Sequence, residues 1–266
     1  MPLLSSPGID HVLSETRYHK SYFFPEYTIC GERMQHENRI TALLVSEGVR
    51  EFGFVDQSRY DKIAPLGYGL QDLLPSARSA LVYIKPLSVS VVTHFPETYS
   101  GPEYHAYVRE KRKINTQLRR IGEQLVDIFC DWGFNTQVIP KGSHNYRGAV
   151  SLKHCAVYAG LGVLGKNSLL INPHYGPCLR IGAVITEYLP TECGAPLKEH
   201  VCNFCHRCIT ACPSGALHIP RESEQYHISV ETCHAWYCIM RGISYQVKDA
   251  DVNCGLCMKA CPVGKE

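Results

Sequence analysis

The sequence has no run of 18 consecutive apolar residues, which is the length that a membrane-spanning helix needs. Its first 20 residues also lack a basic stretch followed by an apolar core, the pattern of a secretory signal. Together these absences predict a cytoplasmic protein that has no membrane partner.

The sequence also has little net charge. Its 27 basic and 25 acidic residues leave a formal net charge of +2. A nucleic-acid-binding protein usually shows a marked basic excess, so we do not expect nucleic acid as a partner. The basic run REKRK at 109–113 is expected to be a solvated face of a helix.

Cysteine, by contrast, is abundant and unevenly placed. The chain has 14 cysteines in 266 residues, and nine of them lie in the last 65 residues. Disulfide frameworks are typical of small exported domains, and nothing here predicts export. The cysteines therefore indicate metal or cluster ligation.

The spacing of these cysteines indicates which metal group they bind. CNFCHRCITACP, which starts at Cys202, has the C-x2-C-x2-C-x3-C-P spacing of bacterial ferredoxins, and CGLCMKACP, from Cys254, repeats its second half. Zinc needs four ligands in a tetrahedron and seldom uses such runs. We therefore predict two [4Fe–4S] clusters.

In two-cluster ferredoxins the fourth cysteine of a run binds the other cluster. Cluster I would then be bound by Cys202, Cys205, Cys208 and Cys261. Cluster II would be bound by Cys212, Cys254, Cys257 and one cysteine from between the runs. Cys233 and Cys238 both qualify, and Cys233 is preferred because it follows the short β-like segment 227–230.

The other 200 residues predict an α+β domain. An amphipathic helix runs into a strand within 37–56, and a long helix with an apolar stripe covers 105–134, closed by Gly133. Buried strands are expected at 80–84 and 179–189, and a further strand is expected at 135–140. We divide the chain into a cofactor and substrate domain, 1–195, and a ferredoxin-like domain, 196–266.

The glycine-rich segment GLGVLGKNSLL, 160–170, fits G-x-G-x-x-G and most of the phosphate-loop pattern. A dinucleotide motif must follow a strand and open a helix, whereas this segment follows a helix-like stretch and precedes a strand-like one. Asn167 also replaces the Ser or Thr of a phosphate loop. Neither nucleotide motif holds. Close approach to a flat or bulky group and a plain helix-to-strand turn both stay open.

The segment from Ala156 to Pro190, followed by the cysteine runs, resembles the epoxyqueuosine reductase and reductive dehalogenase superfamily. Segments 67–87 and 102–107 are also similar to it, so the resemblance covers 35–266. It implies a nitroreductase-like α/β/α domain that binds a base-off corrinoid of the cobalamin type, followed by the two-cluster domain. Electrons would pass from reduced ferredoxin or flavodoxin through the clusters to cobalt.

The resemblance also implies site residues. Epoxyqueuosine reductases have a proton donor in an Asp-Tyr-His segment, where this chain has Glu103, Tyr104 and His105. Glu103 is the first candidate donor, although a carboxylate at a helix N-terminus is also favoured for structural reasons. Tyr104 is the second candidate, because reductive dehalogenases use a tyrosine. The implied corrinoid contacts are Lys153, His154, Gly160, Gly162, Gly165, Lys166, Asn167 and Ser168.

The expected function is that of a corrinoid-dependent iron–sulfur reductase acting on a small or medium-sized organic substrate. The sequence lacks the C-terminal helical repeats that help epoxyqueuosine reductases hold tRNA, so intact tRNA is not expected as the substrate. Two alternatives stay open. One is an electron-transfer protein that reduces a partner's corrinoid, and the other is a flavin-dependent iron–sulfur oxidoreductase.

Overall fold

The computed structural model describes residues 29–140, 150–199, 201–202, 205–219, 228–244 and 252–265, so the features expected in the first 20 residues lie outside it. A four-stranded antiparallel sheet, in the order β1-β2-β6-β3, forms the centre of the molecule. Its strands are β1 Glu51–Asp56, β2 Ser79–Pro86, β3 Thr136–Val138 and β6 Leu179–Thr186. This arrangement confirms the predicted strands and the mixed α/β fold class.

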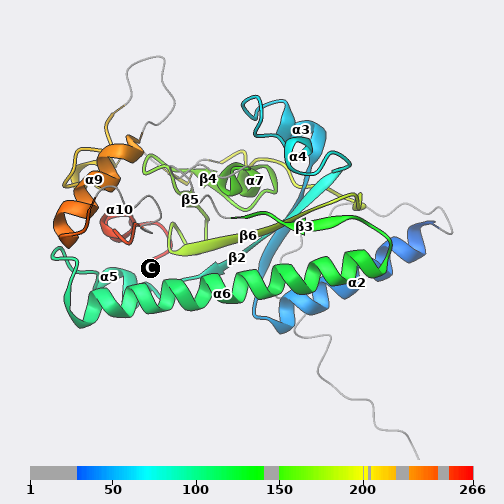
Figure 1. Ribbon diagram of the computed structural model, residues 1–266, viewed down its shortest axis with the longest axis horizontal. Coiled ribbons are helices and arrows are strands. Elements are labelled where there is room, and N and C mark those ends of the chain that lie inside the picture. Colours follow the sequence, from blue (N-terminus) through cyan, green and yellow to red (C-terminus); the bar gives the residue numbers. More distant parts are fainter. Residues whose placement is uncertain are drawn as a thin grey trace, which may run out of the picture.

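Helices cover both faces of the sheet (Figure 1). The long helix α6, Gly101–Asp131, packs on one face together with α2, Ile29–Ser46. On the other face lies α7, Leu152–Tyr158, beside α3, Gln57–Asp61, and α4, Leu70–Leu73. Because both of its faces are buried, β2 is an almost continuous apolar run. Within the described ranges, no helix is long and apolar enough to cross a membrane.

The predicted apolar stripe of α6 faces the sheet. The helix passes so close to β2 at Gly122 that an added Cβ atom would lie 2.8 Å from the Tyr83 hydroxyl oxygen. That hydroxyl donates to the Leu118 carbonyl at 2.9 Å. The helix starts at Gly101, four residues before the predicted start, and its first turn contains a proline, a position that tolerates the missing N–H.

The basic run of α6 was predicted to be exposed to solvent, and only part of it is. Arg109, Arg112 and Lys113 are exposed, but Lys111 is only 4% exposed. The helical period explains the difference, because Lys111 follows Tyr107 by four residues and so continues the buried stripe. The expectation of a wholly solvated run was therefore wrong at this residue.

The cysteine-rich part of the chain lies beside the N-terminal half of α6 (Figure 1). It contains α8 Arg207–Thr210, α9 Val230–Arg241 and α10 Leu256–Lys259, with α5 Val89–Thr93 next to α10. The β-like segment expected before Cys233 forms only a bridge between Ile228 and Leu217. Helix α9 then begins, because the Ser229 side chain accepts a hydrogen bond from the Thr232 N–H at 3.2 Å and caps it.

Candidate iron–sulfur and cofactor site

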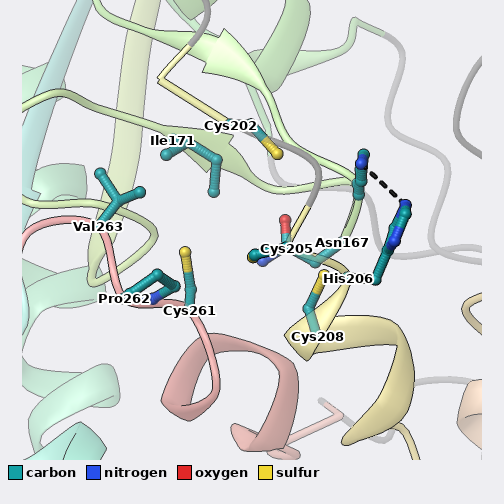
Figure 2. Close-up of a pocket in the computed structure, with 10 residues that line it drawn as sticks. Asn167, Ile171, Cys202, Cys205, His206, Cys208, Cys261, Pro262 and Val263 are labelled. Carbon is teal, nitrogen blue, oxygen red and sulfur yellow. Dashed lines mark hydrogen bonds between the residues drawn. The ribbon is translucent and has the colours of Figure 1, made fainter.

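The four cysteines assigned to cluster I line one small cavity (Figure 2). Cys205 and Cys208 come from the start of α8, where His206 has the left-handed φ of +52°. Cys202 comes from the preceding loop, and Cys261 comes from the turn after α10. The fold thus brings Cys261 to the first run, as the ferredoxin pattern predicts, although ligation itself stays a prediction.

The cysteines assigned to cluster II also lie together. Burial, together with the neighbouring thiols of Cys254 and Cys212, raises the pKa of Cys233 to about 12. Burial and the same neighbours, with Cys233 itself, raise the pKa of Cys257. Cys238 instead contacts His234, with 3.3 Å between its Sγ and Nε2. The structure therefore places Cys233, and not Cys238, beside the other three cysteines.

Both sets suit a cluster better than a single ion. Among the described residues, no three His, Cys, Asp or Glu side chains lie close enough together to hold one metal ion. A four-iron cluster holds its thiolates further apart than one ion does. Buried thiols that raise one another's pKa also need positive charge between them before they ionise, and the iron of a bound cluster would supply that charge.

The glycine-rich loop is a hairpin between β4, Val163–Leu164, and β5, Leu170–Ile171. A Cβ atom added to Gly162 would lie 2.5 Å from the Ile171 carbonyl oxygen, and one added to Gly165 would lie 2.5 Å from the Ile171 side chain. At Gly160, which has a φ of +78°, it would lie 3.1 Å from the Ala195 carbonyl oxygen. Packing within the chain therefore accounts for these glycines, and their contact with a cofactor stays a prediction.

We expect Gly162→Ala to lower the free energy of unfolding by about 1–3 kcal/mol, the usual cost of overpacking a tight site. The loss should appear in urea unfolding of protein that contains no corrinoid, since the obstacle is the backbone of Ile171. The same measurement with added cobalamin is the control. A loss seen only with cobalamin would instead assign Gly162 to the cofactor.

Two residues of the predicted corrinoid set lie beside cluster I. Lys166 and Asn167 line its cavity, and the Lys166 Nζ is 3.0 Å from the His206 Nε2 (Figure 2). Lys153 donates to the carbonyl of Ser168 at 2.6 Å, and burial lowers the pKa of its ammonium. This part of the chain therefore lies next to the cysteines, and a role in binding a corrinoid stays a prediction.

His154, from the same predicted set, lies on α7. Its Nδ1 is 2.7 Å from the Ser151 Oγ. Burial lowers the pKa of His154, and the Lys153 ammonium lowers it further. The ring is therefore favoured in its neutral form, in which it can both donate and accept a hydrogen bond.

The two candidate proton donors differ in access. Glu103 is exposed in the first turn of α6. Tyr104 is buried, its hydroxyl is 2.8 Å from the Tyr237 hydroxyl, and the Arg241 guanidinium lies 4.9 Å from its ring centroid. Burial raises the pKa of Tyr104, so its phenol stays protonated. Glu103 is the candidate that a molecule outside the fold can reach.

A cavity that no sequence motif marks opens at one edge of the sheet. Strand β3 ends at Val138, opposite Val184, so it does not cover the part of β6 from Leu179 to Gly182. The cavity at this edge has a volume of about 420 Å³, within the range of sites for organic ligands. Its polar lining comes from α6 and its apolar lining from the strands and α7. The lining includes Asn115, Thr116, Arg119, Val138, Ile139, Leu152 and Ile181.

Comparison with known proteins agrees with the sequence resemblance. The family described as "4Fe-4S dicluster domain" matches residues 201–265. The epoxyqueuosine reductase of Bacillus subtilis is 28% identical over 256 residues, covering 83% of this chain and 61% of that protein. The epoxyqueuosine reductase of Synechocystis sp. is 26% identical over 216 residues, covering 74% and 66%. The chain thus spans less than two thirds of the length of each relative.

Solved structures show the same fold. An epoxyqueuosine reductase with an epoxyqueuosine-modified tRNA-Tyr stem loop has a TM-score of 0.56 and 22% identity, over 88% of this chain and 66% of that one. The catabolic reductive dehalogenase NpRdhA, in complex with 3-bromo-4-hydroxybenzoic acid, has a TM-score of 0.62 and 20% identity, over 85% and 31%. A reductive dehalogenase described in terms of B12-dependent dehalogenation has the same score and identity, over 85% and 32%. The predicted resemblance is confirmed: the chain is similar to both groups and carries a 4Fe-4S dicluster domain.

Proposed function

We propose that the protein is an iron–sulfur reductase that uses a corrinoid to reduce a small or medium-sized organic substrate. The grouping of eight cysteines into two sets of four carries this proposal. The fold shared with a B12-dependent dehalogenase supports the choice of a corrinoid. Reduced ferredoxin or flavodoxin would supply the electrons, as the resemblance implies.

The cavity at the edge of β6 has the size of a small organic substrate, or of one edge of a larger cofactor that extends beyond it. When bound, a corrinoid supplies a strongly reducing cobalt centre. Asn115, Thr116 and Arg119 can donate hydrogen bonds to its amide side arms, and the apolar lining from Val138 and Ile181 excludes water. Leu152, which also lines the cavity, directly precedes Lys153 and His154 of the predicted corrinoid set.

The remaining step is delivery of a proton to the reduced substrate. Glu103 is exposed at the start of α6 and is the group we assign to it, with Tyr104 as the second candidate. Positioned acids of this kind typically accelerate proton transfer by about 10²–10⁴-fold. The aromatic acid bound by NpRdhA represents the size of substrate that a cavity of about 420 Å³ can take.

Metal analysis with an anaerobic absorption spectrum, before and after adding cobalamin, tests this function. We expect about eight irons per chain, four for each cluster of a dicluster domain, and about one cobalt with a base-off spectrum. Thr116→Trp, which places a bulky indole in the cavity, should lose the cobalt and keep the iron. Arg109→Ala, on an exposed part of the same helix, is the control and should keep both.

Eight irons without cobalt uptake would contradict the corrinoid. Flavin binding and turnover with a chemical reductant would then separate the two alternatives. A flavin-dependent oxidoreductase binds flavin and turns over alone, whereas an electron-transfer protein needs its partner.

A further inference from the structure

Lys111 is a buried cation that the proposed function does not use. It is 4% exposed on the inner side of α6. Its Nζ donates to the Val252 carbonyl at 3.0 Å and to the Asn253 Oδ1 at 2.8 Å. Asn253 directly precedes Cys254, so the ammonium is held by the backbone and side chain of the segment that carries a predicted cluster II cysteine.

A second set of contacts ties Asn253 to the helix that carries Cys233. The Asn253 Nδ2 donates to the Tyr237 hydroxyl at 3.4 Å, and that hydroxyl is 2.8 Å from the Tyr104 hydroxyl. Tyr237 lies on α9, one turn after Cys233. Lys111 therefore connects α6 to both chain segments that bring Cys233 and Cys254 together.

The charge of Lys111 has a consequence for the cluster. A cluster held by four thiolates is anionic, and reduction by one electron makes it more so. A nearby cation in a region of low dielectric constant stabilises the reduced form and raises the reduction potential. Burial of an ammonium is costly unless partners compensate it, and the Val252 carbonyl and the Asn253 side chain hold this one next to the segment that carries Cys254.

We propose that Lys111 is a positioning residue that raises the reduction potential of cluster II. The inference rests on the proposed assignment of Cys212, Cys233, Cys254 and Cys257 to that cluster. The step is a one-electron transfer from the donor to the cluster, in which no bond forms or breaks and the ammonium keeps its proton.

Cluster I has a different buried lysine and so provides an internal comparison. Lys166 is 5% exposed and lines the cavity of cluster I. Removal of Lys111 should therefore shift the potential of one cluster and leave the other nearly unchanged. Removal of Lys166 should shift the reduction potential of cluster I instead. The two variants together then show which redox transition belongs to which cluster.

The test is a redox titration of the full chain with both clusters, reduced stepwise with dithionite and followed by electron paramagnetic resonance. In Lys111→Met we expect the midpoint potential of one cluster to fall by at least about 59 mV. For a one-electron couple this corresponds to a roughly 10-fold lower equilibrium constant for reduction. Lys111→Arg keeps the charge and should keep most of the potential. Lys113→Met, exposed on the same helix, is the matched control and should shift neither transition.

Lys111→Gln keeps hydrogen-bond donors without the charge. If Lys111→Met loses iron, the redox titration is made with Lys111→Gln instead. Unchanged potentials in Lys111→Gln with a full iron content, or an equal shift of both transitions, would contradict the role proposed for Lys111. Neither result would contradict the proposed function. A wild-type protein without two clusters would overturn the proposed function together with this inference.

Discussion

Cys233→Ala is expected to lower the iron content from about eight toward about four per chain, whereas Cys238→Ala should keep about eight. The thiol of Cys233 lies with Cys212, Cys254 and Cys257, and its loss leaves cluster II with three protein ligands. Cys238 is five residues further along α9 and contacts His234 instead. The two variants remove the same side chain from the same helix, so each controls for the other.

Iron analysis and electron paramagnetic resonance of the dithionite-reduced proteins provide the measurement. A cluster with three ligands can also lose a single iron, and its changed spectrum would then report the damage where the iron content falls only slightly. Loss of iron in Cys238→Ala with full iron in Cys233→Ala would reverse the assignment. Full iron and an unchanged spectrum in both would mean that cluster II takes its fourth ligand from elsewhere.

The sequence predicts most of the cysteine arrangement because ligand spacing is local. Short loops of two or three residues between cysteines limit where the thiols can lie, so the runs around Cys202 and Cys254 could be read directly. The structure places Cys233 with the other three cysteines, but not for the reason that the sequence suggested, and its ligation of cluster II stays a prediction. The favoured residue lies inside a helix rather than after a strand, and helical geometry turns the two side chains in different directions.

Lys111 shows what the sequence does not reveal. Its charge suggested a solvated residue in a basic run, and only its place on the apolar stripe of α6 hinted at burial. Its partners, Val252 and Asn253, are 141 and 142 residues away along the chain. Contacts at such a distance depend on how α6 and the cysteine-rich region pack, which periodicity does not specify.

The glycines and the cavity show the same limit. Three glycines in six residues indicate that space is needed near the backbone, but they do not indicate what fills it. In the structure Ile171 and Ala195 lie against them. The cavity at the edge of β6 exists because β3 is short, and strand length is among the features that a sequence pattern defines least well.

Glu103→Gln is expected to lower kcat by about 10²–10⁴-fold, the usual contribution of a positioned general acid. The amide is similar in size but has no acidic proton to deliver. Tyr104→Phe should have a smaller effect, because the Tyr104 hydroxyl is buried against Tyr237. Turnover of 3-bromo-4-hydroxybenzoic acid, followed as bromide release from cobalamin-loaded protein with a chemical reductant, provides the measurement.

Glu123→Gln is the matched control, because Glu123 is an exposed carboxylate on the same helix, paired with Arg119. It should keep full turnover, and all variants should keep the same iron and cobalt content. Loss of activity in Tyr104→Phe with activity retained in Glu103→Gln would transfer the proton-donor role to the tyrosine and require its hydroxyl to leave Tyr237. Retention in both variants would remove the first turn of α6 from the chemistry. Glu103 would then be no more than a carboxylate favoured by the positive end of the helix dipole.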